Sequence, residues 1–359
     1  MTDTRGGRRE AQPDSAFEFT GTWREFLPIA LTNFLLIIVT LGIYRFWAKA
    51  RERRYLWSRT RFIDDSFEWT GTGLEMFIGA LIVFAIFLPV ILFFQFGLQA
   101  MLLRGETLAA GLLAAALYLG IFYLIGVGTF RALRYRLSRT FWHGIRGGSA
   151  DGGWHFGWQW MWKSFVGALV LGLLIPWSKT SLWNDRWNLL SFGEHRFEAG
   201  ATPDGLWARW LLIYLTPVVG LLMMGIFGLG GAWFSNGGEG AIIGAVIAGL
   251  LFYLLFLVLS VSFYAAFYRH VASATSIAGL EFEFTARTMD WLKLILGNIA
   301  LVVLTLGFGL MLVGYRNWAF VIRHMEASGE VDLDRLLQSK AYAPGEAEGL
   351  ADAFDIGAI

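Results

Sequence analysis

The sequence predicts an integral membrane protein that is all-α apart from small β-hairpins on its cytoplasmic face. Hydrophobic residues make up 56% of the 359 residues and the mean hydropathy is +0.54, whereas soluble domains average about 45–50% apolar residues. Four long stretches carry no charged side chain, and one pattern of residues recurs along the chain. These observations favour a helical membrane protein built from internal repeats.

The four long uncharged stretches cover residues 76–103, 108–130, 210–238 and 240–268. A helix needs about 20 apolar residues to cross the hydrocarbon core of a bilayer. Lipid offers the backbone no hydrogen-bonding partners, so continuous apolar stretches of this length have to be helical. Transmembrane β-strands would be shorter and would alternate polar with apolar side chains. We therefore expect four long transmembrane helices.

Three shorter uncharged segments cover residues 26–44, 164–178 and 294–315. The middle segment lies between Lys163 and Lys179 and is too short to span a membrane comfortably. Because the three segments occupy matching places in the repeats described below, we expect them to behave alike.

The positions of lysine and arginine distinguish two topologies, because basic loops stay on the cytoplasmic side. Seven crossings with an external N-terminus would leave 17 of the 29 basic residues inside and 12 outside. Four crossings place every basic residue except Arg104 on one side. The charge rule therefore favours four crossings with both termini cytoplasmic, which makes the three shorter segments re-entrant or in-plane helices. Seven transmembrane helices are the alternative.

A repeated pattern divides the chain into about two and a half units. Residues 17–20 reappear as residues 282–285, an offset of 265, and Asn33 meets Asn298 at the same offset. A middle copy lies at an offset of 130, and matches at fixed offsets indicate duplication rather than shared membrane composition. The predicted organisation is a polar basic tail (1–16), repeat 1 (17–140), repeat 2 (141–281), a half repeat (282–325) and an acidic tail with one short helix (326–359).

The linkers between the segments are expected to contain β-hairpins and helix starts. In the first linker, two short β-prone runs flank a polar turn at residues 64–66. Two threonines each precede a glutamate at the third position after it, which is the spacing of a helix capping box. The residues assigned to caps in this way are Thr22, Glu25, Thr72 and Glu75.

The linker over residues 45–61 carries seven basic residues with aromatic residues between them. Such clusters at a cytoplasmic interface attract anionic lipid head groups, at about 1 kcal/mol per basic residue. The simplest interpretation is that these side chains only anchor helices and fix the topology. The more specific hypothesis is a head-group or anion site, whose contacts would be Trp47, Lys49, Arg51, Arg54, Tyr55, Trp57 and Lys179.

No pattern typical of catalysis or of a cofactor is present in the sequence. The five histidines are not closely spaced and cysteine is absent, so we expect no metal site. A nucleophile elbow, a phosphate loop and a dinucleotide fingerprint are also missing. We therefore expect no enzymatic activity and no cofactor, and a basic cluster beside a membrane is not expected to bind nucleic acid.

Several motifs in combination resemble the bacterial YjgN family. They are Phe17-x-Phe-x-Gly21, Thr40-Leu-Gly-Ile-Tyr44-x-Phe-Trp47-Ala-Lys49, Arg53-Arg54-Tyr55-Leu-Trp57-x-x-Thr60 and Phe67-x-Trp69-x-Gly71-Thr-Gly-x-Glu75. The resemblance is closest over residues 17–77 and extends over residues 17–325, although the middle copy departs at Pro203 and Gly205. It implies a multi-pass protein of the bacterial inner membrane, and it brings no catalytic residues because the family is classed as a domain of unknown function.

Two functions are carried forward from the sequence. The leading hypothesis is a non-enzymatic membrane protein that contacts anionic lipids, with a homo-oligomer through glycine-rich helices such as Gly240-x-x-x-Gly244 as a further expectation. The alternative is a small-molecule transporter or channel, because many transporters are built from pseudo-symmetric repeats with broken segments. An enclosed polar cavity ringed by Asn33 and Asn298 would favour transport. A cavity with paired carboxylates or an activated histidine would favour a third hypothesis, a lipid-modifying enzyme.

Overall fold

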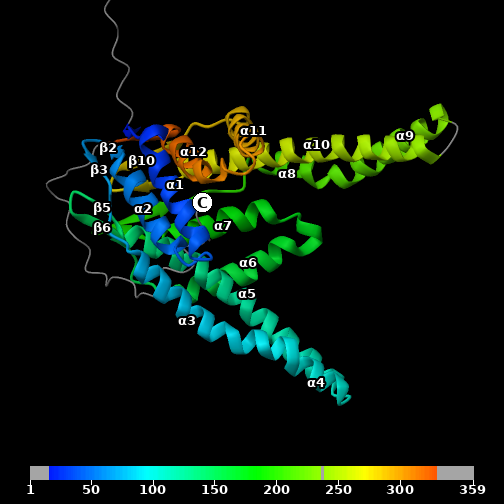
Figure 1. Cartoon of the computed structure of the whole chain (residues 1–359), viewed down its shortest axis with the longest axis horizontal. Coiled ribbons are helices and arrows are strands. Elements are labelled where there is room, and N and C mark those ends of the chain that lie inside the picture. Colours follow the sequence, from blue (N-terminus) through cyan, green and yellow to red (C-terminus); the bar gives the residue numbers. More distant parts are fainter. Residues whose placement is uncertain (1–15, 236–237, 330–359) are drawn as a thin grey trace, which may run out of the picture.

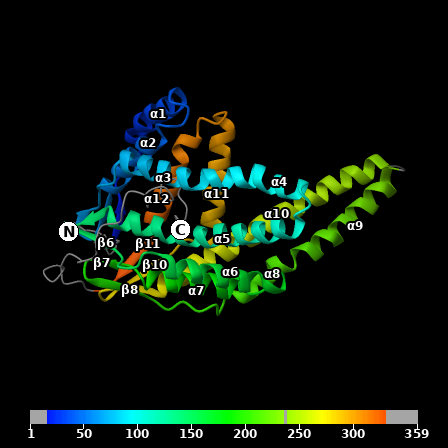
Figure 2. The same cartoon turned by 90° about the horizontal axis from the view of Figure 1, so that it is seen from below.

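The computed structural model describes residues 16–235 and 238–329 (Figure 1). The basic tail over residues 1–15 and most of the acidic tail, including the helix expected near residues 331–338, lie outside the described residues. In the described part, pairs of helices project from a sheet that lies at one end of the molecule, as Figure 2 shows.

The four predicted long segments are helical and form two antiparallel hairpins. The segments of the first hairpin are α3 (Gly73–Leu92), a π-helical turn η1 (Phe93–Gly97), α4 (Leu98–Leu103) and α5 (Thr107–Ser138). Those of the second are α8 (Trp207–Tyr214), α9 (Thr216–Ser235) and α10 (Gly238–Ser273). In the described residues, these hairpins supply the four helices that are long and apolar enough to cross a membrane.

Glycines bring the two helices of the second long hairpin into close contact. A Cβ atom at Gly244 would collide with the carbonyl oxygen of Phe227, and one at Gly231 would collide with that of Gly240. Glycine is therefore required at these crossings, because any side chain would push α9 and α10 apart. The predicted glycine packing is used here within one chain. The prediction of a homo-oligomer is untested.

The three shorter segments are not single helices, because each turns back on itself as a pair of short helices. The pairs are α1 (Trp23–Val39) with α2 (Arg45–Ser58), α6 (Trp154–Gly172) with α7 (Ile175–Trp187), and α11 (Thr288–Leu304) with α12 (Leu310–Arg323). We call these pairs the short hairpins. Hydropathy alone did not reveal the turns, because the turn residues are as apolar as the helices around them.

The tips of the short hairpins share one backbone conformation. Leu41, Leu171 and Leu306 have φ values of 50°, 56° and 50°, and the glycine that follows each leucine also has a positive φ. Only glycine adopts this left-handed region freely, so the leucines are held there by the turn. The three leucines are 94%, 89% and 89% exposed. Each short hairpin thus ends in an apolar tip with no protein cover.

The strands form two sheets, of three and eight strands, and not the separate small hairpins that the sequence predicted, so the fold is not all-α. The strands are β1 (Phe17–Phe19), β2 (Thr60–Phe62), β3 (Asp65–Ser66), β4 (Glu68–Trp69), β5 (Thr140–Trp142), β6 (Ile145–Gly148), β7 (Ser191–Phe192), β8 (His195–Ala199), β9 (Thr275–Ile277), β10 (Leu280–Phe284) and β11 (Met325–Ser328). Every strand pairs antiparallel with its neighbour along the chain, except that β3 and β4 follow each other as one interrupted strand. Strand β1 also contacts β11, which brings the two ends of this meander together. We call the whole arrangement the strand ring.

Five helix pairs follow one another along the strand ring, alternately short and long. Each pair starts from one strand and returns to a strand that hydrogen-bonds to the first. The bounds of α11 and α12 equal those of α1 and α2 at the predicted offset of 265. Two-residue turns with positive φ at both positions join β5 to β6 and β9 to β10, as expected for tight hairpins.

Tryptophan–threonine hydrogen bonds connect neighbouring helix pairs. In each case the indole Nε1 of a short hairpin donates to the hydroxyl of a threonine at the start of a strand. The three bonds are Trp57 to Thr140 (2.8 Å), Trp183 to Thr275 (3.0 Å) and Trp318 to Thr60 (2.9 Å). The third bond joins the last short hairpin to the first, and Trp318 also stacks on Trp57 with 4.2 Å between ring centroids.

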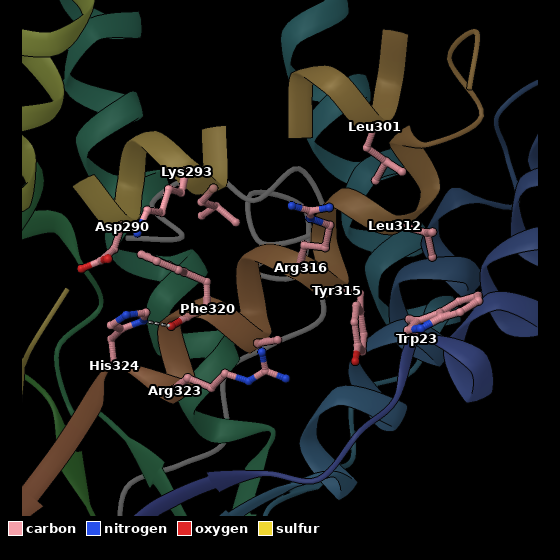
Figure 3. Close-up of a pocket in the computed structure, with 12 residues that line it drawn as sticks. Trp23, Asp290, Lys293, Leu301, Leu312, Tyr315, Arg316, Phe320, Arg323 and His324 are labelled. Atoms are coloured by element: carbon pink, nitrogen blue, oxygen red, sulfur yellow. Dashed lines mark hydrogen bonds between the residues drawn. The ribbon is translucent and has the colours of Figure 1, made fainter. Parts of the chain in front are cut away.

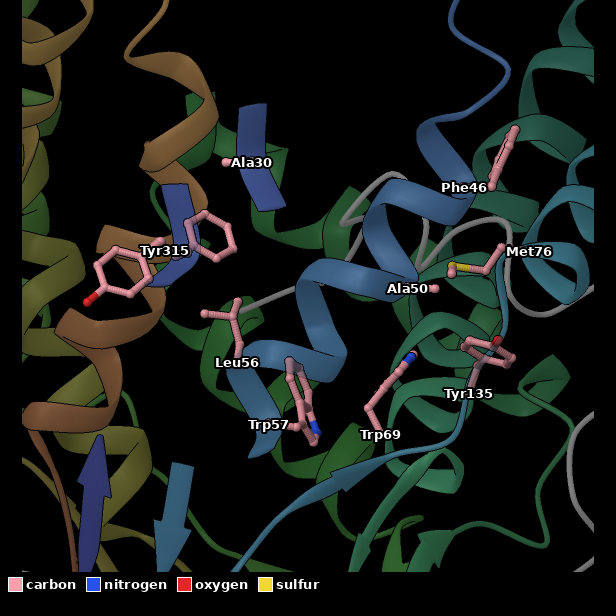
Figure 4. Packing of buried hydrophobic residues seen from close by; sticks show 10 residues of the cluster. Ala30, Phe46, Ala50, Leu56, Trp57, Trp69, Met76, Tyr135 and Tyr315 are labelled. Carbon is pink, nitrogen blue, oxygen red and sulfur yellow. The ribbon is translucent and has the colours of Figure 1, made fainter. Parts of the chain in front are cut away.

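A hydrophobic cluster lies beneath this junction (Figure 4). It combines Phe26 and Leu56 of the first short hairpin with Met76, Tyr135 and Tyr315 from α3, α5 and α12. A second cluster fills the inside of the strand ring, with Phe62, Trp142, Phe197, Ile277 and Leu280 among its members. Burial of side chains from distant segments therefore holds the ring together.

We expect the replacement of Thr60 by Val to lower the thermal stability of the protein in detergent. The change leaves the partly buried Trp318 Nε1 without its acceptor, at a cost of about 1–3 kcal/mol. Trp318→Phe removes the donor of the same bond, so the double variant should lose less than the sum of the two single losses. Trp233→Phe on α9, where the side chain is 83% exposed, is the control and should leave the melting temperature unchanged. Additive losses would show that the bond does not couple the two ends.

Candidate functional site

Polar contacts hold the two helices of each short hairpin together. In the first short hairpin, Asn33 is 7% exposed and its Nδ2 donates to the carbonyl oxygen of Ala48 at 3.2 Å. The Oδ1 atom of Asn33 accepts from Arg51 of the predicted head-group set at 3.2 Å, and the Arg51 side chain is exposed. Such bonds satisfy polar atoms that would otherwise be costly to bury among apolar residues.

Matching positions carry the contacts of the other two short hairpins. Lys163 stands at an offset of 130 from the asparagine of the first hairpin, and it donates to Ser181 at 2.6 Å and forms an ion pair with Asp185. Asn298 stands at the offset of 265 and donates to the side-chain oxygen of Asn317 at 2.9 Å. The two predicted asparagines therefore serve separate hairpins and do not ring one cavity, which removes the observation that would have favoured a transporter.

The two predicted caps place their glutamates in other contacts besides the helix start. Thr22 Oγ1 accepts a hydrogen bond from the N–H of Glu25 at 3.4 Å, and Thr72 Oγ1 accepts one from the N–H of Glu75 at 3.2 Å. In a reciprocal capping box, the glutamate carboxylate accepts a hydrogen bond from the backbone N–H of the capping threonine. Here the N–H of Thr22 donates instead to the hydroxyl of Tyr55. Both carboxylates are thus available for contacts with the following helices.

A glutamate, a tyrosine and an arginine form the first of two matching triads. The Tyr55 hydroxyl donates to Glu25 at 3.1 Å, and the Arg59 guanidinium lies 3.1 Å from the same carboxylate. Burial, followed by the hydrogen bond to Glu25, raises the pKa of Tyr55 to about 12. Tyr55 therefore keeps its proton at physiological pH and acts as a hydrogen-bond donor within the protein. Tyr55 is also a member of the predicted head-group set.

The second triad repeats this geometry at the start of α3. The Tyr135 hydroxyl donates to Glu75 at 3.0 Å, and the Arg139 guanidinium lies 3.1 Å from the same carboxylate. Tyr135 is fully buried, and the Glu75–Arg139 pair is about half as exposed as the pair in the first triad. The second triad is therefore less screened by solvent, and each of its bonds should contribute more to stability.

The aromatic residues of the predicted head-group set contact other residues of the protein, and Trp57 is buried. Trp57 is 4% exposed and its Nε1 is bonded to Thr140. Trp47 is half-buried, with its ring centroid 6.3 Å from that of Tyr44 and 5.4 Å from that of Phe77. Trp57 therefore contributes to the packing of the fold, and its contact with a lipid head group stays a prediction.

The basic residues of the same set are divided between α2 and α7. Lys49 lies 3.8 Å from Glu52 on the same helix, and the Lys179 ammonium lies 5.1 Å from the ring centroid of Tyr264 on α10. Arg54 is exposed. The linker that looked densest in basic residues thus forms helix α2, whose side chains point in several directions and contact different elements.

A groove of about 740 Å³ lies between α11, α12 and the start of α1 (Figure 3). Lys293 of α11 and Arg316 and Arg323 of α12 line it, together with Trp23 of α1. Within the part of the chain that the structure describes, none of the three cations forms an ion pair or a hydrogen bond. The groove therefore carries three cations without an ion pair, alongside the carboxylate of Asp290. We call it the cationic groove.

The lining of the cationic groove changes from charged to apolar along its length. Leu301 and Leu312 lie at the end of the groove nearest the exposed tip of the hairpin, whereas Lys293 and Arg323 lie toward the strand ring. Arg316 lies between them, about 9 Å along α12 from its first residue at 1.5 Å per residue. A ligand with an anionic head and an apolar chain would match this order of side chains.

The third copy of the triad is incomplete, and this leaves the cationic groove open. Asp290, Phe320 and His324 match the members of the first triad at the offset of 265, and all three line the groove. Phe320 has no hydroxyl to bridge the other two. Asp290 accepts from the N–H of Arg287 at 2.9 Å, and His324 Nδ1 lies 2.8 Å from the carbonyl oxygen of Phe320. The contacts that close this place in the first copy are thus absent.

No group of three or more histidine, aspartate or glutamate side chains that could hold a metal ion occurs in the described residues. A histidine–carboxylate pair of the kind found in some active sites is formed by His143 and Asp64, with 2.9 Å between His143 Nε2 and Asp64 Oδ1. This pair lies on an exposed turn and not in a cavity, and the hydrogen bond from His143 lowers the pKa of Asp64.

Comparison with known proteins identifies the family. Residues 14–353 match the sequence profile of a family described as a bacterial protein of unknown function, DUF898. The chain belongs to the DUF898 family. The match includes both long hairpins, all three short hairpins and the strand ring, so the whole described fold falls within the family.

Relatives of this DUF898 protein include inner membrane proteins, which confirms the resemblance to YjgN. Inner membrane protein YjgN of Salmonella typhimurium (strain LT2) is 30% identical over 141 residues, which cover 39% of this chain and 30% of that protein. The proteins of the same name from Escherichia coli O157:H7 and K12 are 30% and 28% identical over 134 residues, or 37% of this chain and 31% of theirs. The chain thus matches about a third of the length of these relatives. No solved structure matches it.

We expect the two triads to differ in their contribution to stability. Glu75→Gln should lower the free energy of unfolding by about 1–3 kcal/mol, because it weakens hydrogen bonds to a buried tyrosine and a partly buried arginine. Glu25→Gln should cost less than about 1 kcal/mol, because its ion pair is 46% exposed. Thermal unfolding in detergent would measure both, with Glu106→Gln at the exposed tip of the first long hairpin as control. Equal losses for both variants would contradict the assignment.

Proposed function

We propose that this protein is a non-enzymatic inner-membrane protein that binds the head groups of anionic lipids in the cationic groove. The observation that carries the proposal is the set of three cations without partners in the described residues, Lys293, Arg316 and Arg323, next to an apolar hairpin tip. Lys293 and Arg323 are exposed and Arg316 is half-buried, so the three cations can be reached by an anion from outside the chain. A lipid phosphate at the membrane interface would supply that anion.

The sequence hypothesis placed head-group binding in the linker over residues 45–61, and the proposal moves it to the cationic groove. Arg51 and Tyr55 are engaged within the first short hairpin, and Trp57 is buried. Arg54 is exposed and keeps its predicted role as a surface anchor on the cytoplasmic side. The linker then fixes the helices, while the groove binds the lipid.

We further propose that the short hairpins are duplicated units that embed their tips in the cytoplasmic leaflet without crossing it. Exposed leucines at Leu41, Leu171 and Leu306 would be unfavourable in water, and burial in lipid would stabilise each by about 1.5–3 kcal/mol. The uncharged run of α11, over residues 294–304, is about 16 Å long, which is half of a hydrocarbon core of about 30 Å. Figures 1 and 2 both show α11 running across the direction of the long hairpins.

Four crossings would follow from this arrangement, with both termini on the cytoplasmic side. The two long hairpins supply the four crossing helices, and the strand ring lies at the end of the molecule where the short hairpins begin. Arg104, at the tip of the first long hairpin, would be the single basic residue on the far side. This topology retains the distribution of charge from which it was predicted.

Replacement of two groove cations should weaken lipid binding. The double variant Lys293→Gln/Arg316→Gln loses two charges worth about 1 kcal/mol each, so the affinity for phosphatidylglycerol should fall about 30-fold. Native mass spectrometry in non-ionic detergent would count bound phosphatidylglycerol, with phosphatidylcholine as the zwitterionic comparison. The matched control is Arg61→Gln/Arg196→Gln, which removes two exposed arginines from strands β2 and β8.

Two outcomes would count against the groove. If the control variant loses phosphatidylglycerol as strongly as the groove variant, binding depends on net charge alone. If Lys49→Gln/Arg54→Gln loses it while the groove variant does not, the head-group site lies in the linker, as the sequence hypothesis had it. Retained binding by the control and the linker variants, with loss in the groove variant, supports the proposal.

Cysteine accessibility tests the topology, because the chain has no cysteine of its own. The exposed positions for single cysteines are Ser58 at the end of α2, Glu194 between β7 and β8, Glu281 on β10 and Glu106 at the tip of the first long hairpin. We expect an impermeant maleimide added outside spheroplasts to label only position 106. Labelling of positions 194 and 281 from outside would show that the short segments cross, and would remove the proposal of embedded tips.

A further inference from the structure

A cavity of about 310 Å³ lies between the strand ring and the helices, apart from the cationic groove. Residues of α7, α10, α11 and α12 line it together with residues of the strands. On α11 and α12, Trp291 and Val321 face this cavity while their neighbours Asp290 and Phe320 face the groove, so the last short hairpin separates the two spaces. We call it the inner cavity.

The inner cavity continues into the strand ring as apolar space. A second cavity of about 190 Å³ lies inside the ring, and the two share walls formed by Phe17, Leu137, Phe197 and Phe282. Aromatic and aliphatic side chains surround both spaces almost entirely. An apolar cavity of about 150 Å³ accepts a molecule of the size of benzene, so the inner cavity can hold about ten to fifteen non-hydrogen atoms.

Arg186 of α7 is a charged residue in the wall of this apolar space. Its Nε atom is buried without a hydrogen-bond partner, and no carboxylate pairs with it in the described residues. Burial lowers the pKa of Arg186 to about 10, which reflects the cost of removing this cation from water. Its guanidinium lies 5.2 Å from the ring centroid of Trp183, and a single aromatic contact of this kind compensates only part of that cost.

Two more donors in the wall are also unsatisfied. The Nε1 atoms of Trp187 and Trp291 are buried and have no hydrogen-bond partner among the described residues. Both residues line the inner cavity, on α7 and α11. Buried donors are nearly always paired in proteins, so three unpaired donors around one cavity indicate an acceptor that enters from outside the chain.

The fold itself does not require arginine at this position. The matching residues of the other two short hairpins are Leu56 in the first and Val321 in the last, at the same offsets that relate the three hairpin tips. Leu56 is buried in a hydrophobic cluster, and Val321 packs against another. Two copies of the same helix therefore fill this place with an aliphatic side chain, and only the middle copy carries a charge.

We propose that the inner cavity binds a small anionic amphiphile, with its carboxylate or phosphate on Arg186 and its apolar chain among Phe197 and Phe282. The head group would accept hydrogen bonds from the three unpaired donors and neutralise the arginine. The chain, of about ten carbons, would fill the apolar space toward the strand ring. This site is independent of the lipid groove, because different side chains form it.

Photo-crosslinking would test the proposal on the full-length protein in detergent. The probe is a decanoic acid that carries a diazirine in its chain, and labelled peptides are identified by mass spectrometry. We expect labels on the peptides that contain Phe197 and Phe282, competed by decanoate or decyl phosphate and not by decanol. Stronger competition by one of the two anions would identify the head group as carboxylate or phosphate.

Variants decide whether Arg186 holds the head group. Arg186→Leu should reduce the labelling at least tenfold, and its melting temperature without probe should be equal to or higher than that of the parent, because an uncompensated buried charge is removed. Arg196→Leu, an exposed arginine on β8, is the control and should label normally. If Arg186→Leu lowers the melting temperature, a second variant is used. Ala272→Leu narrows the cavity and leaves Arg186 intact, and it should still block labelling. Labels confined to the long helices, or unchanged labelling in both cavity variants, would overturn the proposal.

Discussion

The closure of the strand ring is the interaction on which the rest of the structure depends. Its strands are two to five residues long, and an isolated hairpin of that size is at best marginally stable in water. They persist because each pairs with its neighbour and because Phe62, Trp142 and Leu280 fill the inside of the ring. The bond from Trp318 to Thr60 then joins the two ends of the meander. Five helix pairs that would otherwise diverge are thereby fixed to one base.

The helices were predictable from the sequence because lipid imposes a local rule. A long uncharged run has to be helical, so the runs over residues 76–103 and 240–268 located their helices without tertiary information. The short hairpins were not predicted, because the turn at Leu41-Gly42 is as apolar as the helices that it joins. The strand ring was not predicted either, because pairs such as β8 with β9 join segments on either side of a long hairpin, and turn signals say nothing about such partners.

The candidate site shows why a dense cluster in the sequence need not be dense in space. The seven basic residues over 45–61 lie mainly on one helix, which spreads them around its axis. Arg53 is buried over the ring of Trp69, and Arg51 bonds within its hairpin. The cationic groove is lined by only three cations, which come from two helices. No run of charged residues in the sequence predicted this groove. One signal in the sequence was available, since the offset of 265 places Phe320 where the triad needs Tyr55.

The two proposed sites lie where the three short hairpins differ from one another, and not where they agree. What the copies share, such as the tip glycines and the contacts at Asn33, Lys163 and Asn298, holds each hairpin in shape. Where a copy departs, the shape is kept and the chemistry changes: the loss of a hydroxyl at Phe320 leaves a groove, and Arg186 adds a charge where its counterparts are aliphatic. A partly buried charge without an ion pair is costly to the fold. A ligand that neutralises Arg186, as proposed above, would offset this cost.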